Sequence, residues 1–124
     1  MKNRILLRPA AERDLSDQAE YLTQHQNLPT GLRFLRAAEE TIRLLARQPE
    51  MGTRTECRSS FLEGMRMFPL KRFPNHLVFY RYMKSDIEII RVLHGARDIE
   101  SLFKHRAEDG EDSLGADQKG KATG

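Results

Sequence analysis

The sequence predicts an α+β domain in which a helical hairpin packs on an antiparallel meander sheet, with the element order β-α-α-β-β-β. In the first half of the chain, apolar residues recur every three or four positions, which is typical of amphipathic helices. From about residue 62 the period changes to two, which indicates strands. The 124 residues can bury one core without disulfides or metals. We therefore expect a single domain over residues 1–103.

The N-terminal part predicts a short strand followed by a helix. The strand is expected over residues 3–8, where Ile5 and Leu7 share one face. Pro9 suits the first turn of a helix, where its missing N–H is not needed. The apolar face of this helix recurs at spacings of four, four and three, through Ala11, Leu15, Ala19 and Leu22. We expect the helix to break at residues 25–27.

A second helix is predicted to begin near Pro29, with Asn27 or Thr30 as its N-cap. Pro49 and Gly52 are expected to end it. Its predicted apolar stripe consists of Leu35, Ala38, Ile42 and Leu45, with Phe34 and Thr41 beside it. Because the link between the two helices is very short, they should form an antiparallel hairpin.

Three strands are expected in the second half. Met65 and Met67 alternate with other residues in the first, and Pro69 indicates an edge or a bulge there. A turn over residues 71–75 should lead to a central strand over residues 76–82, which is apolar on both faces. A three-residue turn at 84–86 should then connect to a last strand over residues 87–94.

Composition excludes several classes of protein. No apolar run approaches the roughly 18 residues of a membrane-spanning helix. The single cysteine, Cys57, cannot form an internal disulfide, which fits a reducing cytoplasm. Residues 104–124 contain Leu114 as their only large apolar residue, and we expect this tail to be disordered. We therefore expect a cytoplasmic protein with no membrane partner.

Basic residues are concentrated in one part of a chain whose net charge is only +3. Residues 54–97 hold nine Lys or Arg against four Asp or Glu. Such a surface indicates an anionic partner, either nucleic acid or an acidic protein segment, although an ordinary soluble surface is the alternative. The four histidines lack metal-ligand spacing, and no phosphate-binding loop, CxxC, HExxH or GxSxG motif occurs. We expect no metal and no cofactor.

The stretch "RVLHGARD" at residues 91–98 ends the last predicted strand in polar groups. One interpretation is a metal-free ribonuclease, in which His94 moves a proton while Arg81, Arg91 and Arg97 stabilise the phosphorane. The other is a basic docking surface, with Asp98 capping a short helix over residues 99–103. The residues alone favour docking.

Three segments carry a family resemblance: "RPAAERDLSDQAEYL" at 8–22, "RFLRAAEETIRLLARQPEMG" at 33–52 and "HLVFYRYMKSDIEIIRVLHGARDI" at 76–99. Together they resemble the RelE/ParE superfamily of bacterial toxins from toxin–antitoxin pairs, over about residues 3–103. The resemblance implies the same fold that periodicity predicts. RelE-like members cut messenger RNA on the ribosome, whereas ParE-like members poison DNA gyrase and need no nuclease site.

The positions of the RelE nuclease residues favour the ParE-like branch. Arg97 falls on a RelE catalytic arginine, and Lys71 falls near the RelE lysine pair. However, Phe103 stands where RelE has its tyrosine, and Leu77 stands where RelE has a second arginine. The phenyl ring has no hydroxyl to transfer a proton, and leucine offers no charged donor to phosphate.

The resemblance thus implies the toxin of a type II toxin–antitoxin module, a gyrase inhibitor that causes growth arrest and plasmid stabilisation. The residues expected to bind the target are Lys71, Arg72, Arg81, Arg91, His94 and Arg97. Under the alternative, a ribosome-dependent endoribonuclease acting on mRNA, the catalytic residues would be His94, Arg97 and Arg81. A third reading is a detoxified relative kept as a binding module. A cognate antitoxin should fold onto the hairpin and sheet as an acidic amphipathic segment, forming a hetero-oligomer.

Overall fold

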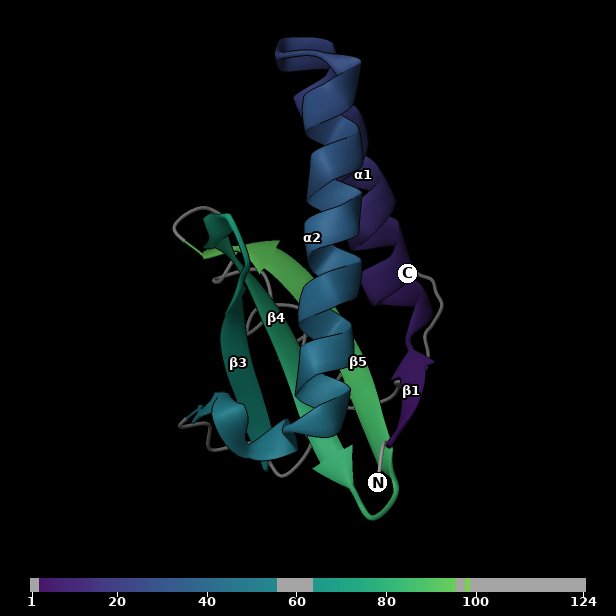
Figure 1. Ribbon diagram of the computed structural model, residues 1–124, viewed down its shortest axis with the longest axis vertical. Coiled ribbons are helices and arrows are strands. Elements are labelled where there is room, and N and C mark those ends of the chain that lie inside the picture. Colours follow the sequence, from purple (N-terminus) through teal and green to yellow (C-terminus); the bar gives the residue numbers. More distant parts are fainter. Residues whose placement is uncertain (1–2, 56–63, 96–97, 99–124) are drawn as a thin grey trace. The chain divides into compact units, whose positions relative to one another are not determined.

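The computed structural model describes residues 3–55, 64–95 and residue 98. The chain divides into a unit of residues 1–94 and a second unit from residue 95, and the fold is that of the first. Its elements are β1 (Arg4–Leu7), α1 (Pro9–His25), α2 (Leu28–Arg47), a 3₁₀ turn η1 (Pro49–Met51), β2 (Thr53–Arg54), β3 (Met65–Leu70), β4 (Phe73–Met83) and β5 (Asp86–His94). Figure 1 shows the α1–α2 hairpin beside the sheet, which confirms the predicted α+β class. The predicted domain over 1–103 and tail over 104–124 extend beyond the described residues.

The sheet has five strands in the order β1-β5-β4-β3-β2. β3, β4 and β5 form the predicted antiparallel meander. β1 pairs with β5 in parallel, from Arg4 opposite Asp86 to Leu7 opposite Ile89. The sheet is therefore mixed, because the hairpin crosses over between its first and last strands. β2 pairs with β3 through two residues, which is too short to produce a periodic signal in the sequence.

Both hairpin turns are shorter than predicted. The first consists of Lys71 and Arg72, and the strand resumes at Phe73 instead of residue 76. The β3–β4 register shifts between Pro69 and Leu70, where the sequence indicated an edge or a bulge. Pro74 is tolerated in β4 because this shift leaves it unpaired with β3. The second turn consists of Lys84 and Ser85, and Asp86 already pairs with Met83. Arg72 and Lys84 have φ angles of 69° and 49°, so each turn is closed by a left-handed residue.

The helix boundaries agree with the sequence prediction, but one core assignment was wrong. The Asn27 side chain caps α2 by accepting from the Thr30 N–H at 2.9 Å. Leu35, which was assigned to the buried stripe, is 39% exposed. It lies instead on a separate row with Leu28 and Leu32, which are also exposed. The buried face of α2 is centred on Phe34, Ala38, Thr41 and Leu45. This set begins one residue earlier than the predicted stripe, at Phe34 instead of Leu35.

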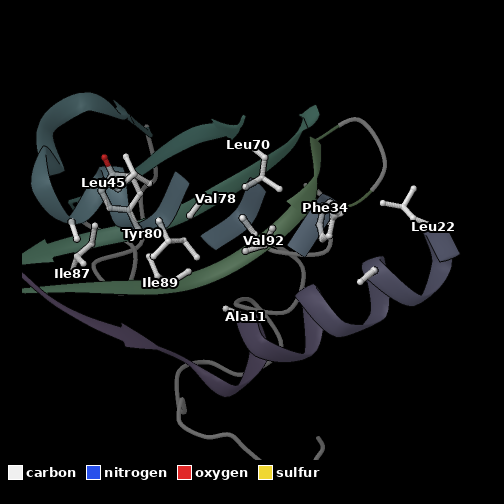
Figure 2. Close-up of a cluster of buried hydrophobic side chains, with 14 residues drawn as sticks. Ala11, Leu22, Phe34, Leu45, Leu70, Val78, Tyr80, Ile87, Ile89 and Val92 are labelled. Atoms are coloured by element: carbon white, nitrogen blue, oxygen red, sulfur yellow. The ribbon is translucent and has the colours of Figure 1, made fainter. Parts of the chain in front are cut away.

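The hydrophobic core lies between the hairpin and the sheet. Figure 2 shows Ala11 and Leu22 from α1 and Phe34 and Leu45 from α2 against strand residues such as Val78. The hairpin itself is tightly packed at Gly31, where an added Cβ would meet the Thr23 side chain and lie 2.8 Å from the Ala19 carbonyl oxygen. Glycine is therefore required for the close approach of α1 and α2.

Tyr80 fixes the turn that leaves α2. Its hydroxyl donates to the Pro49 carbonyl at 2.7 Å and accepts from the Gly52 N–H at 2.9 Å. Gly52 has no room for a side chain, since a Cβ there would meet the same hydroxyl. Burial raises the Tyr80 pKa above its ordinary value of 10.0, although the Gly52 hydrogen bond and the Arg66 charge act in the opposite direction. The neutral phenol is thus the form that the fold stabilises.

Replacing Tyr80 by phenylalanine should make the stability difference between variant and wild type depend on pH. At neutral pH we expect a loss of about 1–3 kcal/mol, because Pro49 and Gly52 each lose a hydrogen-bond partner. Since the folded pKa of Tyr80 is raised, the unfolded state ionises first, and the wild type loses this advantage as pH rises above 10.0. Urea unfolding of both proteins from pH 7 to 11 measures the gap. A gap that widens in alkali would contradict the argument.

Candidate target-binding surface

The structure separates the predicted target-binding residues into two groups. Lys71 and Arg72 form the β3–β4 turn, and His94 ends β5 opposite His76 at the same end of the sheet. We call Lys71, Arg72, His76 and His94 the turn end. Arg81 lies five residues along β4 from His76, or about 17 Å away in an extended strand. Arg97 lies outside the described residues.

Arg81 belongs to a charge network within the sheet. Its Nη2 lies 2.9 Å from Glu88 Oε1, while Glu88 Oε2 lies 3.2 Å from Arg8 Nη1. The Arg81 and Glu88 side chains are 24% and 15% exposed. One carboxylate therefore serves two guanidinium groups, one from β4 and one from Arg8, which follows β1 and precedes α1. Arg81 links β4 to β5, and the Glu88 carboxylate largely neutralises its positive charge.

Arg91 is held by Asp14 on α1. The guanidinium makes two hydrogen bonds to the carboxylate, at 2.7 and 2.9 Å. The same carboxylate accepts the Val92 N–H at 3.0 Å, and Gln18, one helical turn further on, donates to the Val92 carbonyl at 2.6 Å. Because β1 pairs with β5 only as far as Ile89, these two side chains satisfy the strand edge beyond β1. Arg91 thus anchors α1 to the sheet.

The turn itself is more accessible. The Lys71 N–H donates to Thr41 Oγ1 at 3.0 Å, and the Thr41 hydroxyl donates to the Ala37 carbonyl at 2.8 Å. Thr41, buried on α2, thereby fixes the turn backbone. Arg72 makes a long 3.4 Å contact with Glu40, and both side chains are largely exposed. Within residues 3–55 and 64–95, the Lys71 ammonium has no ion-pair partner.

His94 belongs to an aromatic group at the turn end. Its ring meets the His76 ring edge-on at a centroid distance of 5.1 Å, and His76 meets the Phe34 ring at 5.0 Å. Phe73 lies against the same two rings of Phe34 and His76. His94 is half-buried in this contact. A histidine packed in this way stiffens the end of the sheet beside the basic turn.

The described residues do not assemble a RelE-type nuclease site around His94. Arg81 lies toward the other end of β4, and Arg91 is bound by Asp14. Arg97 and Phe103, which the RelE comparison also requires, lie outside the described residues, as does the segment that Asp98 was expected to cap. In the described part of the chain, no group of three or more His, Cys, Asp or Glu side chains could hold a metal ion.

Sequence reasoning missed a groove of about 540 Å³ between α2 and β3. Its lining residues are Glu40, Thr41, Arg43, Leu44, Arg47, Phe68, Pro69, Leu70, Lys71 and Pro74. They come from a helix, an edge strand and the turn that follows it, so no local motif joins them. The only sequence signal was Leu44, an apolar residue outside the predicted stripe of α2.

Comparison with known proteins identifies the family. A family model described as "ParE toxin of type II toxin-antitoxin system, parDE" matches residues 5–99. A solved structure titled "Chromosomal ParDE TA system from P. aeruginosa" superposes with a TM-score of 0.62 at 16% sequence identity, covering 75% of this chain and 96% of that one. No curated protein matches significantly. None of the described helices is long and apolar enough to span a membrane. The chain therefore belongs to the ParE toxin family of type II toxin–antitoxin systems.

Proposed function

We propose that this toxin arrests growth by inhibiting DNA gyrase in the cytoplasm, and that a cognate antitoxin neutralises it. The match of the ParE family model over residues 5–99 carries the proposal, since it includes both helices and the whole meander. The toxin acts by binding, and it holds gyrase with broken DNA on the enzyme. The turn end is the docking surface, because Lys71 and Arg72 are exposed there on a backbone that Thr41 fixes.

Arg81 and Arg91 support this assignment through what they already bind. A nuclease needs guanidinium groups that are directed at the scissile phosphate. Arg81 would have to leave Glu88, and Arg91 would have to leave Asp14, before either could serve a phosphorane. Leu77 supplies no charge at the position of the second RelE arginine. Gyrase binding at the turn end requires neither ion pair to break.

A supercoiling assay with purified gyrase tests the proposal. The wild-type toxin should abolish supercoiling and leave cleaved DNA bound to gyrase. The double variant Lys71→Glu/Arg72→Glu should need about tenfold more toxin for the same inhibition, because it replaces attraction by repulsion at the turn. Arg13→Glu/Lys84→Glu makes the same charge change at exposed sites away from the turn end and should inhibit as the wild type does.

Two outcomes would count against gyrase as the target. Unchanged supercoiling at excess wild-type toxin would remove the basis of the proposal. Codon-aligned cuts in translated messages that disappear in His94→Ala would establish the ribonuclease alternative instead. Co-expression supplies the second arm, because the antitoxin encoded beside the toxin should restore growth. A chain that leaves growth unaffected without antitoxin would be a detoxified binding module.

A further inference from the structure

α2 carries a row of arginines on the side that faces away from the core. They recur at spacings of three, seven and four residues, which places them along one face of the helix: Arg33, Arg36, Arg43 and Arg47. All four are exposed, whereas Phe34, Ala37 and Ala38 between them are buried. We call these four residues the arginine row.

The charges of the arginine row are only weakly engaged within the toxin. Arg43 forms an i,i+4 pair with Glu39, and Arg33 donates to a threonine hydroxyl of its own helix at 3.0 Å. Exposed pairs of this kind contribute little to stability, so they yield readily to a stronger anion. In the described part of the chain neither Arg36 nor Arg47 has an ion-pair partner.

The β3–β4 turn extends this positive surface. Glu40 interrupts the row on the same face of α2, but Arg72 lies 3.4 Å from its carboxylate and offsets that charge. Lys71 lines the α2–β3 groove together with Arg43 and Arg47. α2 and the two turn residues thus hold six cations against two acids. A surface with this imbalance attracts an anion that is long enough to reach most of it.

The length of the row suits a polyanion better than a single phosphate. Arg33 and Arg47 are fourteen residues apart, which is about 21 Å along a helix. Duplex DNA carries a phosphate about every 3.4 Å on each strand, so this distance covers about six base pairs. Figure 1 shows α2 as one unbroken helix with no other labelled element in front of it, so a rod-shaped partner has room to lie along it.

The residue types in the row favour the backbone of a duplex over the bases of a single strand. Single-stranded nucleic acid is commonly held by aromatic side chains on which its bases stack. α2 has one aromatic residue, Phe34, and it is fully buried. Arginine binds phosphate oxygens through its planar fork and needs no base to do so. The row is therefore suited to phosphates in any sequence.

We propose that the arginine row binds the phosphate backbone of duplex DNA, and that it does so on the DNA segment held by gyrase. This inference rests on the proposed function, which brings the toxin to an enzyme that carries cleaved DNA. The turn end then contacts the gyrase protein while α2 contacts the DNA, so one toxin molecule bridges the two. A toxin that holds both leaves more slowly than one that holds gyrase alone.

Anisotropy of a short fluorescent duplex of mixed sequence, titrated with full-length toxin and no gyrase, tests the site directly. Four phosphate contacts should give a slope of log K against log salt of about −3 to −4, since each contributes about −0.9. Arg33→Gln/Arg36→Gln and Arg43→Gln/Arg47→Gln should each make the slope shallower by about 1.8 and weaken binding about tenfold or more at low salt. A wild-type toxin that binds no duplex at low salt would overturn the site.

Two further variants distinguish the row from general attraction to a basic protein. Arg13→Gln/Lys84→Gln removes two cations at exposed positions outside the row, and it should stay within about twofold of wild type. Arg36→Lys/Arg47→Lys keeps the charges and should retain most of the binding, which a damaged fold would not do. Equal losses in the control and row variants would overturn the assignment to α2.

A second measurement connects the row with gyrase. Both glutamine variants of the row should bind DNA-free gyrase as the wild type does, because they leave the turn end intact. They should nevertheless trap about fivefold less cleaved DNA, since they have lost one of two linked contacts. Trapping at the wild-type level in both variants would overturn the bridge.

The outcomes separate the row from the proposed function. A wild-type toxin that inhibits gyrase but binds no DNA by itself would overturn the row as a DNA site and leave the function standing. A toxin that binds DNA through the row but inhibits no gyrase would refute the function and the bridge, and would support the row as a DNA site. Binding to duplex RNA of the same sequence that is more than about tenfold tighter would overturn DNA as the ligand and favour the ribosome alternative.

Discussion

Replacing Phe34 by alanine should destabilise the toxin by about 3–5 kcal/mol, the range found for large aromatic truncations in cores. Phe34 is fully buried in α2, and its ring meets Phe73 and His76 at 5.4 and 5.0 Å. The cavity would open directly beneath the turn end, between the hairpin and the start of β4. Urea unfolding measures the loss, and the proposed gyrase inhibition should fall with it because the proposed docking surface loses its support.

The neighbouring position provides the control. Leu35→Ala removes a similar apolar side chain from the next residue of the same helix, but Leu35 is 39% exposed. We expect this variant to lose well under about 1 kcal/mol. The pair therefore tests the rotational setting of α2, which the sequence alone placed incorrectly. Equal losses in Phe34→Ala and Leu35→Ala would show that the buried face lies between them.

Asp14→Ala is the second large expected effect, at about 2–3 kcal/mol. Removal of this carboxylate leaves Arg91 without its bidentate partner and the Val92 N–H without its acceptor. Breaking a fully buried ion pair costs about 3–5 kcal/mol, and the value here is lower because the Asp14 and Arg91 side chains are 12% and 21% exposed. Chemical denaturation at pH 7 measures the change in the free energy of unfolding.

Two further variants separate the structural role of Arg91 from a role in binding the target. Asp14→Asn keeps an acceptor for Val92 and should recover part of the lost stability. In Asp14→Leu/Arg91→Met the pair is replaced by apolar groups, which should be less destabilising than losing one partner alone. If Arg91 serves only to hold α1, this double variant inhibits gyrase as wild type does. A folded double variant without inhibition would return Arg91 to the target-binding surface.

Local patterns were sufficient for most of the fold. The helical spacing of Ala11, Ala19 and Leu22 predicted the buried face of α1, and Asn27 two positions before Pro29 predicted where α2 begins. The setting of α2 was harder, because this helix has a buried row and an exposed apolar row that contains Leu28, Leu32 and Leu35. Both rows have helical spacing, so the sequence alone does not show which of them is buried; that depends on what packs against each. The parallel pairing of β1 was likewise set by the crossover and not by β1 itself.

The candidate site was less predictable, because it depends on contacts between distant parts of the chain. Charge counting marked Arg81 and Arg91 as available for a partner, but Asp14 lies 77 positions from Arg91 in the sequence. The groove joins α2 to the β3–β4 turn, and its outline exists only once Thr41 has fixed the Lys71 backbone. Residue type and spacing identify which groups are cationic. Tertiary packing decides which of them remain accessible.

The clamp of Asp14 and Gln18 on Val92 also bears on solubility. An exposed strand margin with unused amide and carbonyl groups invites a second molecule to extend the sheet, which is the first step toward a fibril. Here α1 occupies both groups of Val92, so the part of β5 that extends beyond β1 offers neither of them to a second molecule. The clamp thus prevents a second toxin molecule from pairing with β5 at Val92, which removes one way for concentrated toxin to begin cross-β aggregation.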